Sequence, residues 1–270
     1  MRLRSIVRSR RFTVGAAVVA ALGIAAAVAG GYPFRPTETV LARPSRAHVF
    51  GTDELGRDVL TRILHGGGTA LEVSVTSALL AALIGTAIGL VAGYSGGILD
   101  ESLLKVTEFV LVVPRFLLAL VVAALFGGHL WVIVLVLAVT FWPHTARLVR
   151  GEAIALRERP FVEAARAVGA GNVRILTRHL LPLALPIVVV NASFQAGQAV
   201  LIESGLAFLG LGDPNVVSWG AMLAGAQSYL GIAWWTSVFP GTALALLVLA
   251  LNLAGDGLAD ALGVAPLRAR

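Results

Sequence analysis

The sequence predicts an all-α, polytopic membrane protein with six transmembrane helices. Hydrophobic residues make up 57% of the 270 residues and charged residues only 13%, whereas globular proteins average about 45–50% and about 25%. The mean hydropathy is +0.86. A single water-soluble core of this size cannot bury that many apolar side chains. The chain has no cysteine, which excludes disulfide frameworks, thiolate zinc sites and cysteine nucleophiles.

Six apolar stretches account for the predicted spans. A bilayer core of about 30 Å needs roughly 20 apolar residues in helical form. In chain order the stretches are residues 12–34, 73–93, 109–126, 128–146, 180–202 and 232–255. The third contains Pro114 and Arg115, and a proline can bend a helix. We therefore divide the chain into residues 1–72, a five-helix core at 73–262 with a loop at 147–182, and a tail at 263–270.

The first stretch also resembles a secretory signal. Five arginines precede an alanine-rich run that ends in Ala27-Val28-Ala29, a small-residue cleavage pattern. Cleavage would leave five spans. We expect an uncut signal anchor instead, because the multi-span chain behind it needs no separate export signal.

Arginine and lysine in the loops predict the orientation. With the N-terminus inside, the inner segments 1–11, 94–108, 147–179 and 256–270 hold fifteen basic residues, and the outer segments hold five, all within 35–72. The positive-inside rule therefore places both termini in the cytoplasm. The same rule explains the net charge of +6 without nucleic-acid binding.

The longest inner loop carries its own helical pattern. Pro160 suits a first helical turn, and Phe161, Ala164, Ala165 and Val168 follow at spacings that form one apolar stripe. Glu163 and Arg166 fall off the stripe. Gly169 is placed to end this helix in a left-handed conformation. We expect Asn172 to cap a second helical segment at 173–181, before Pro182.

Two interpretations of this loop follow from the residues alone. Its arginines can lie on anionic lipid headgroups. Alternatively, the short helix can seat in a groove of a cytoplasmic partner, where paired alanines permit close approach.

The loop resembles a known signature. Glu163-Ala164-Ala165, three residues, Gly169, nine residues and then His179-Leu180-Leu181-Pro182 is similar to the EAA signature of permease subunits of bacterial ABC importers. His179 stands where the general signature favours an aliphatic residue, and this ending resembles the peptide and nickel branch. The resemblance implies a coupling helix in a groove of the ATPase, with Phe161, Glu163, Ala164, Ala165, Arg166, Val168, Gly169, Leu181 and Pro182 as coupling residues.

A second resemblance lies in the outer segment after the first span. An amphipathic helix is predicted by the spacing of Leu55, Val59 and Ile63. We expect Asp53 to cap this helix, Glu54 to interact favourably with the positive end of its dipole, and the glycines at 66–68 to interrupt it. The stretch from Phe50 to Asp58 is similar to the Phe-Gly-Thr-Asp-x-x-Gly-Arg-Asp motif of C-type permeases of dipeptide, oligopeptide and nickel importers. The matching motif residues are Gly51, Thr52, Asp53, Gly56, Arg57 and Asp58.

Further matches extend the resemblance over about residues 48–260. They are Pro114 with 117–119, residues 203–212 with Trp219-Gly220, and residues 252–260. This chain departs from the family at Arg115, where a small residue is common, and at 263–266, where an Asp-Pro-Arg ending is common. Arg115 would place a charge near the inner end of a pathway.

The resemblance implies a type I ABC importer permease fold in a bacterial inner membrane. The implied role is half of a translocation path for di- or oligopeptides, with nickel or another small solute as the alternative cargo. The implied partners are a second, homologous permease, one or two ATPase subunits, an extracytoplasmic substrate-binding protein and membrane lipid. ATP and magnesium would bind to the ATPase, and no cofactor to this chain.

Chemistry that the residues do not support is consistent with a non-enzymatic subunit. A phosphate-binding Walker loop needs Gly-Lys-Ser/Thr, and the only lysine is Lys105. No Gly-x-Ser-x-Gly elbow occurs. The histidines show no HExxH pattern or clustered spacing and are expected in loops and interfaces rather than as metal ligands; they are His48, His65, His129, His144 and His179.

Charges in or near the predicted spans are candidates for a pathway, because membrane charges face protein or water. They are Glu72, Glu108, Arg115, Glu203 and Asp256, of which we select Arg115 and Glu203. Glu203 follows a long span at its outer end, where it could meet a peptide ammonium group. A proton-coupled secondary transporter would favour paired acids at mid-membrane and repeated halves, and a non-transporting scaffold remains a third class.

Overall fold

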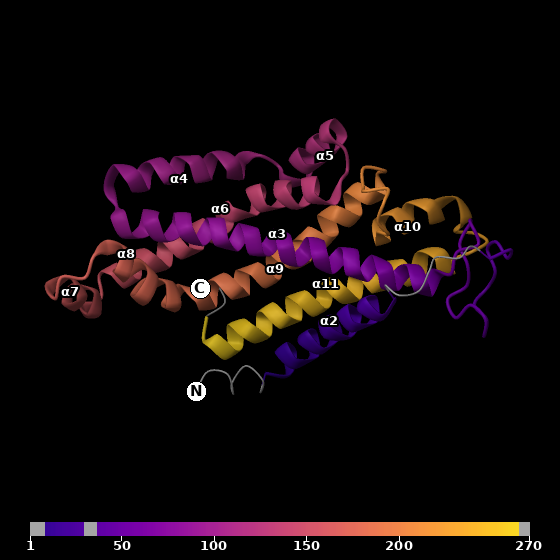
Figure 1. Cartoon of the computed structure of the whole chain (residues 1–270), viewed down its shortest axis with the longest axis horizontal. Helices are drawn as coiled ribbons and strands as arrows, with labels where there is room; N and C mark the ends of the chain where they lie inside the picture. The colour runs from indigo at the N-terminus through magenta and orange to yellow at the C-terminus, as the bar shows by residue number, and fades with distance from the viewer. Residues whose placement is uncertain (1–8, 30–36, 265–270) are drawn as a thin grey trace.

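The chain forms a long helical bundle in a computed structural model that describes residues 9–29 and 37–264 (Figure 1). Within those ranges it contains no β-strand, only an isolated bridge between Thr52 and Asp58. The helices are α2 (Arg10–Ala29), α3 (Val59–Ser95), α4 (Gly97–Val112), α5 (Arg115–Phe126), α6 (Leu130–Arg157), α7 (Pro160–Ala167), α8 (Asn172–Ile175), a π-helical turn (Leu176–Leu180), α9 (Leu181–Phe208), α10 (Trp219–Ala226), a 3₁₀ turn (Gln227–Tyr229) and α11 (Trp235–Leu262).

The helices confirm the all-α membrane architecture. Among the described residues, five helical segments are long and apolar enough to cross a bilayer, and the bent pair α4–α5 makes a sixth span if it is counted as one. The first predicted span ends inside 30–36, outside the described residues. The arginines before position 9 and the tail beyond 264 also lie outside them.

The second predicted span is longer than its hydrophobic stretch. The glycines at 66–68 do not interrupt it, and α3 runs unbroken from Val59 to Ser95. Gly66 serves packing instead, because a Cβ there would stand 2.7 Å from the Trp219 ring. The expected division between residues 72 and 73 therefore falls inside a helix.

The third predicted span is broken at its proline. α4 and α5 meet at an angle of 76° around Val113 and Pro114, because proline lacks the N–H that continues a helix. Residues 97–108, expected in an inner loop, belong to α4. The Asp100 carboxylate holds α4 to α6 by accepting two hydrogen bonds from the Arg150 guanidinium, at 2.6 and 2.7 Å.

A seam of small residues joins α3 to α6. Gly85, Gly89 and Gly93 recur every fourth residue on one face of α3, and a Cβ at any of them would stand 2.5–2.6 Å from a backbone oxygen of α6. In membranes, such spacing lets two helix backbones approach closely enough for van der Waals packing and weak polar contacts to hold them together. These two helices form the rigid centre of the bundle, with α9 against both and α2 outside α11.

Replacing Gly89 by alanine tests this seam. The new methyl group would collide with the Ala146 carbonyl, and such overpacking costs about 1–3 kcal/mol. We expect a melting temperature several degrees lower for the purified protein in detergent. Gly151 on α6 has open space around it, so Gly151→Ala, the same change, should be neutral or slightly stabilising. A Gly89→Ala protein as stable as wild type would contradict the close approach.

Candidate functional site

The helix expected in the long inner loop is present and ends where predicted. α7 begins with Pro160 at its first position and ends at Ala167. Gly169 has φ +82°, a conformation that glycine adopts without strain. The Gly169 N–H donates to the Arg166 carbonyl, and the Ala170 N–H donates to that of Ala165. The loop is a short helix, a sharp turn and a second helix, as the sequence predicts.

The apolar stripe predicted on α7 is only partly exposed. Val162 and Ala165 are buried, and they pack on α3, α6 and the π-helical turn. Phe161 and Val168 are 39% and 85% exposed, and Ala164 is exposed beside Glu163. Three of the four stripe residues are therefore exposed, while Ala165, together with Val162, fixes the helix to the bundle.

A series of side-chain contacts also fixes this loop to the end of α3. The Arg166 guanidinium lies 5.2 Å from the centre of the Tyr94 ring. The Tyr94 hydroxyl donates to the Asn172 side-chain oxygen at 3.0 Å. Asn172 is thus not the cap that the sequence suggested; Gly171 occupies that position, because Tyr94 engages the amide.

The second segment runs on into α9. The helix does not stop at Pro182 but passes through a π-helical turn at Leu176–Leu180, which accommodates the missing proline N–H near the first turn of α9. Leu181 lines a groove between α3 and α9, and Pro182 is exposed. The centre of the Phe161 ring lies 6.3 Å from that of the His179 ring. His179, the residue that differs from the general signature, is therefore next to an exposed residue of α7.

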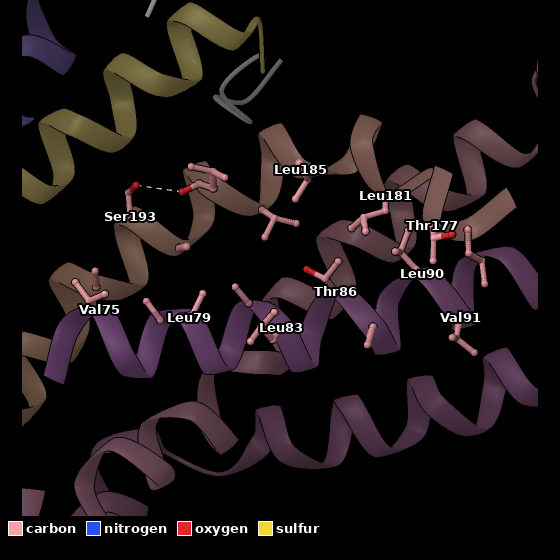
Figure 2. Close-up of a pocket in the computed structure, with 18 of the residues that line it drawn as sticks. Val75, Leu79, Leu83, Thr86, Leu90, Val91, Thr177, Leu181, Leu185 and Ser193 are labelled. Atoms are coloured by element: carbon pink, nitrogen blue, oxygen red, sulfur yellow. Dashed lines mark hydrogen bonds between the residues drawn. The ribbon is translucent and has the colours of Figure 1, made fainter. Parts of the chain in front are cut away.

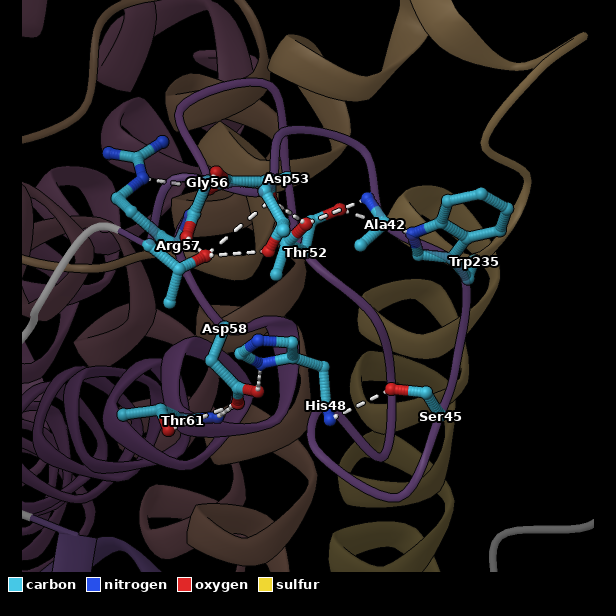
Figure 3. Close-up of polar contacts among 12 residues, drawn as sticks. Ala42, Ser45, His48, Thr52, Asp53, Gly56, Arg57, Asp58, Thr61 and Trp235 are labelled. Carbon is cyan, nitrogen blue, oxygen red and sulfur yellow. Dashed lines mark hydrogen bonds and ion pairs between the residues drawn. The ribbon is translucent and has the colours of Figure 1, made fainter.

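The outer segment is organised around a buried carboxylate (Figure 3). Asp53 is 3% exposed. Its oxygens accept backbone hydrogen bonds from Leu55 and Arg57 and side-chain hydrogen bonds from Arg57 and Arg62, at 2.5–2.9 Å. Burial by itself raises the pKa of Asp53, but these hydrogen bonds and the two guanidinium charges outweigh it and hold the pKa below the ordinary value.

The cap of α3 is a different aspartate from the one expected. Asp58, not Asp53, precedes the helix and accepts from the Thr61 N–H at 2.9 Å. Its other oxygen lies 3.0 Å from His48 Nδ1. Glu54 pairs with Arg57 rather than with the helix end. Sequence reasoning could not choose between two aspartates five residues apart, since both fit a capping pattern.

The remaining motif residues tie the outer segment to the bundle. Thr52 is fully buried; its hydroxyl donates to the Thr39 carbonyl, and its own carbonyl accepts from the Trp235 indole at 3.1 Å. Gly51 and Gly56 form the turns on either side. The Trp235 anchor was missed, because no local pattern predicts a contact across 183 positions.

Arg115 and Glu203 do not form one site. The Arg115 guanidinium donates to the Gln198 side-chain oxygen at 3.0 Å and lies 5.3 Å from the centre of the Phe141 ring. Glu203 is 3% exposed, with the Ser204 hydroxyl 3.2 Å from its carboxylate. The structure therefore places Glu203 inside the protein rather than on an open outer surface.

Two further features of the membrane region were not anticipated. A polar layer joins α6 to α9, where Asn191 donates to the Thr145 hydroxyl and Gln195 to the Phe141 carbonyl. A groove of about 780 Å³ opens between α3 and α9, lined almost wholly by apolar side chains. Figure 2 shows Val75, Leu79 and Leu83 along its α3 wall.

Helix lengths, composition and packing define a multi-pass membrane protein. Residues 85–264 match the family model described as a binding-protein-dependent transport system inner membrane component. The chain belongs to this family, and it is a permease, a transporter subunit rather than a catalytic enzyme.

Named relatives cover most of the chain. A putative peptide transport system permease protein of Brucella suis is 38% identical over 96% of this chain and 89% of the relative. A glutathione transport system permease protein of Pectobacterium atrosepticum is 41% identical over 81% of this chain and 73% of the relative. An inward-facing structure of the MetNI methionine ABC transporter matches with a TM-score of 0.59 at 24% identity, over 76% of this chain and 96% of that one. This match confirms the fold expected from the sequence.

Acidification tests the Asp53 cluster. Because its folded pKa lies below the unfolded value, ionised Asp53 stabilises the protein above the unfolded pKa, and this stabilisation is lost as pH falls through the folded pKa. Asp53→Asn leaves the guanidinium of Arg62 unpaired and buried, which costs about 3–5 kcal/mol. We expect Asp53→Asn to have a much lower melting temperature than the wild type at neutral pH, and the difference between the two proteins to become smaller in acid.

Asp256→Asn, the same change at an exposed residue of α11, serves as the control and should alter stability little at either pH. A constant difference between wild type and Asp53→Asn from neutral pH into acid would contradict the role of the ionised carboxylate.

Proposed function

We propose that this chain is one of two homologous permease halves of an ATP-driven peptide importer in a bacterial inner membrane, with both termini cytoplasmic. The single observation that carries the proposal is α7, a helix fixed by buried Val162 and Ala165 while Phe161, Ala164 and Val168 are exposed. Peptide cargo is supported by the relatives named for peptide and glutathione transport.

The coupling step follows from how α7 is attached. Val162 and Ala165 belong to one buried cluster with residues of α3, α6 and α9, so a force on α7 would reach those helices through packed side chains. A path that opens alternately to each side needs two states and a ligand that favours one of them. ATP with magnesium, bound between ATPase subunits that hold α7, would supply that bias.

The second permease would complete the path. The groove between α3 and α9 is apolar, which suits a helix of another membrane subunit better than a hydrated peptide. The outer segment around Asp53 lies at the far end of the bundle from α7 (Figure 1), where an extracytoplasmic binding protein would deliver its ligand.

Substitutions on α7 and in its turn test the coupling role. The full transporter, with its second permease, ATPase and binding protein, is reconstituted in liposomes, and peptide uptake and ATP hydrolysis are measured together. Gly169→Pro cannot keep φ +82°, because proline fixes φ near −65°. Glu163→Lys reverses an exposed charge beside the stripe. We expect uptake to fall at least tenfold in each variant while hydrolysis continues.

Matched controls separate coupling from general damage. Gly171 has φ −69°, which proline accepts, so Gly171→Pro should transport normally. Glu38 is an exposed outer residue, and Glu38→Lys should also leave uptake unchanged. Wild-type uptake in both α7 variants, or hydrolysis that falls in step with uptake, would contradict the proposal.

A further inference from the structure

A positive charge lies at the break between α4 and α5, beside the central parts of α6 and α9. Arg115 is the first residue of α5 and contacts Phe141 on α6 and Gln198 on α9. Phe141 lies eleven residues from the outer end of α6 and Gln198 ten from that of α9, which is about 15 Å at 1.5 Å per residue. That depth is half of a bilayer core of about 30 Å, so Arg115 is deeper than the inner end expected from the sequence.

Within residues 9–29 and 37–264, no carboxylate pairs with Arg115. Glu203 is five residues beyond Gln198 on α9, about 140° around the helix, and it is buried against Ser204. Glu108 is exposed on α4, across the 76° bend. The guanidinium has only a neutral amide and an aromatic face as partners.

The surroundings of Arg115 add positive rather than negative charge. Arg147 follows Phe141 at six residues along α6 and is exposed. The N-terminus of α5 has no side-chain cap, and the dipole of a helix places about half a positive charge there. Gln198 beside it is exposed as well.

An uncompensated arginine at this depth is not stable against lipid. A charged residue at the centre of a membrane helix costs about 2.5–3.5 kcal/mol even on the lowest scale, unless it faces water or protein. Arg115 is partly exposed, so this face of α5, α6 and α9 must border a hydrated space. Broken membrane helices in transporters use such N-termini to hold anionic substrate groups.

We propose that Arg115, Gln198 and the first turn of α5 form a mid-membrane station for a carboxylate of the transported solute, and that the cargo is a peptide with a free C-terminal carboxylate. This inference rests on the proposed import function. A guanidinium suits a carboxylate because its planar fork donates two parallel hydrogen bonds.

The test compares a tripeptide carrying a free C-terminal carboxylate with the same tripeptide as its C-terminal amide. The full transporter is reconstituted in liposomes with saturating binding protein, and ATP-dependent uptake of each peptide is measured. The same binding protein serves every variant, so its own preference cancels when acid-to-amide uptake ratios are compared. We expect Arg115→Gln to lower uptake of the free-carboxylate peptide at least tenfold, and the acid-to-amide uptake ratio to fall as well. Arg115→Lys, which keeps the positive charge, should retain much of the wild-type uptake of the free-carboxylate peptide.

A second variant keeps the station testable if Arg115→Gln assembles poorly. Gln198 already lies 3.0 Å from the Arg115 guanidinium, so Gln198→Glu places a carboxylate of the protein beside it. This carboxylate would compete with that of the peptide for Arg115 and should lower the acid-to-amide uptake ratio. Lys105→Gln, which removes an exposed charge elsewhere on α4, is the control and should leave the ratio unchanged.

The outcomes separate the two proposals. Absence of ATP-dependent uptake of either peptide by the wild type overturns the proposed import function itself. Wild-type uptake with an unchanged ratio in Arg115→Gln and Gln198→Glu overturns only the carboxylate station, as does an equal fall for both peptides, which a merely structural role would produce.

Discussion

The close approach of α3 to α6 holds the bundle together and positions the other helices around it. Without Cβ atoms at Gly85, Gly89 and Gly93, the two backbones approach closely over about 12 Å of helix. In lipid there is no hydrophobic driving force for apolar helices to associate. Close van der Waals packing and polar contacts between the helices must therefore hold the bundle together. A pair of helices joined along three turns moves as one body. The Asp100–Arg150 contact then attaches α4 to that body at its inner end.

The rigid pair connects two features that lie far apart. At one end of the bundle, the buried cluster that contains Val162 and Ala165 and the Arg166–Tyr94 contact hold α7, which leaves Phe161, Ala164 and Val168 exposed. At mid-membrane, Phe141 of the same α6 lies beneath the Arg115 guanidinium. A displacement of α7 therefore reaches the helix that borders the proposed carboxylate station without passing through a flexible loop. At the outer end, Asp53 and Trp235 bind the segment before α3 to the bundle.

Local patterns predicted the local structure well and the long-range contacts poorly. Apolar stretches gave the spans, and the spacing from Pro160 to Gly169 gave α7 and its left-handed turn, because both depend on neighbouring residues. The glycines at 66–68 resembled a helix break, yet Trp219, 153 positions away, fills the space beside Gly66. Asp53 resembled a cap because its two arginines approach it only in the folded chain. The depth of Arg115 depends on which helices pack around the break at Pro114, and no local sequence pattern predicts that packing.

Cross-linking from Val168, an exposed residue at the end of α7, tests whether an ATPase subunit holds this helix. The chain has no cysteine, so Val168→Cys, at a residue 85% exposed, introduces a single reactive thiol. In membrane vesicles that contain the assembled transporter, the account predicts a cross-link from this thiol to an ATPase subunit through a short bifunctional reagent. Val49→Cys, at an exposed position of the outer segment, should give none. A cross-link to the ATPase from position 49, or none from position 168 in a transporter that remains active, would contradict the account.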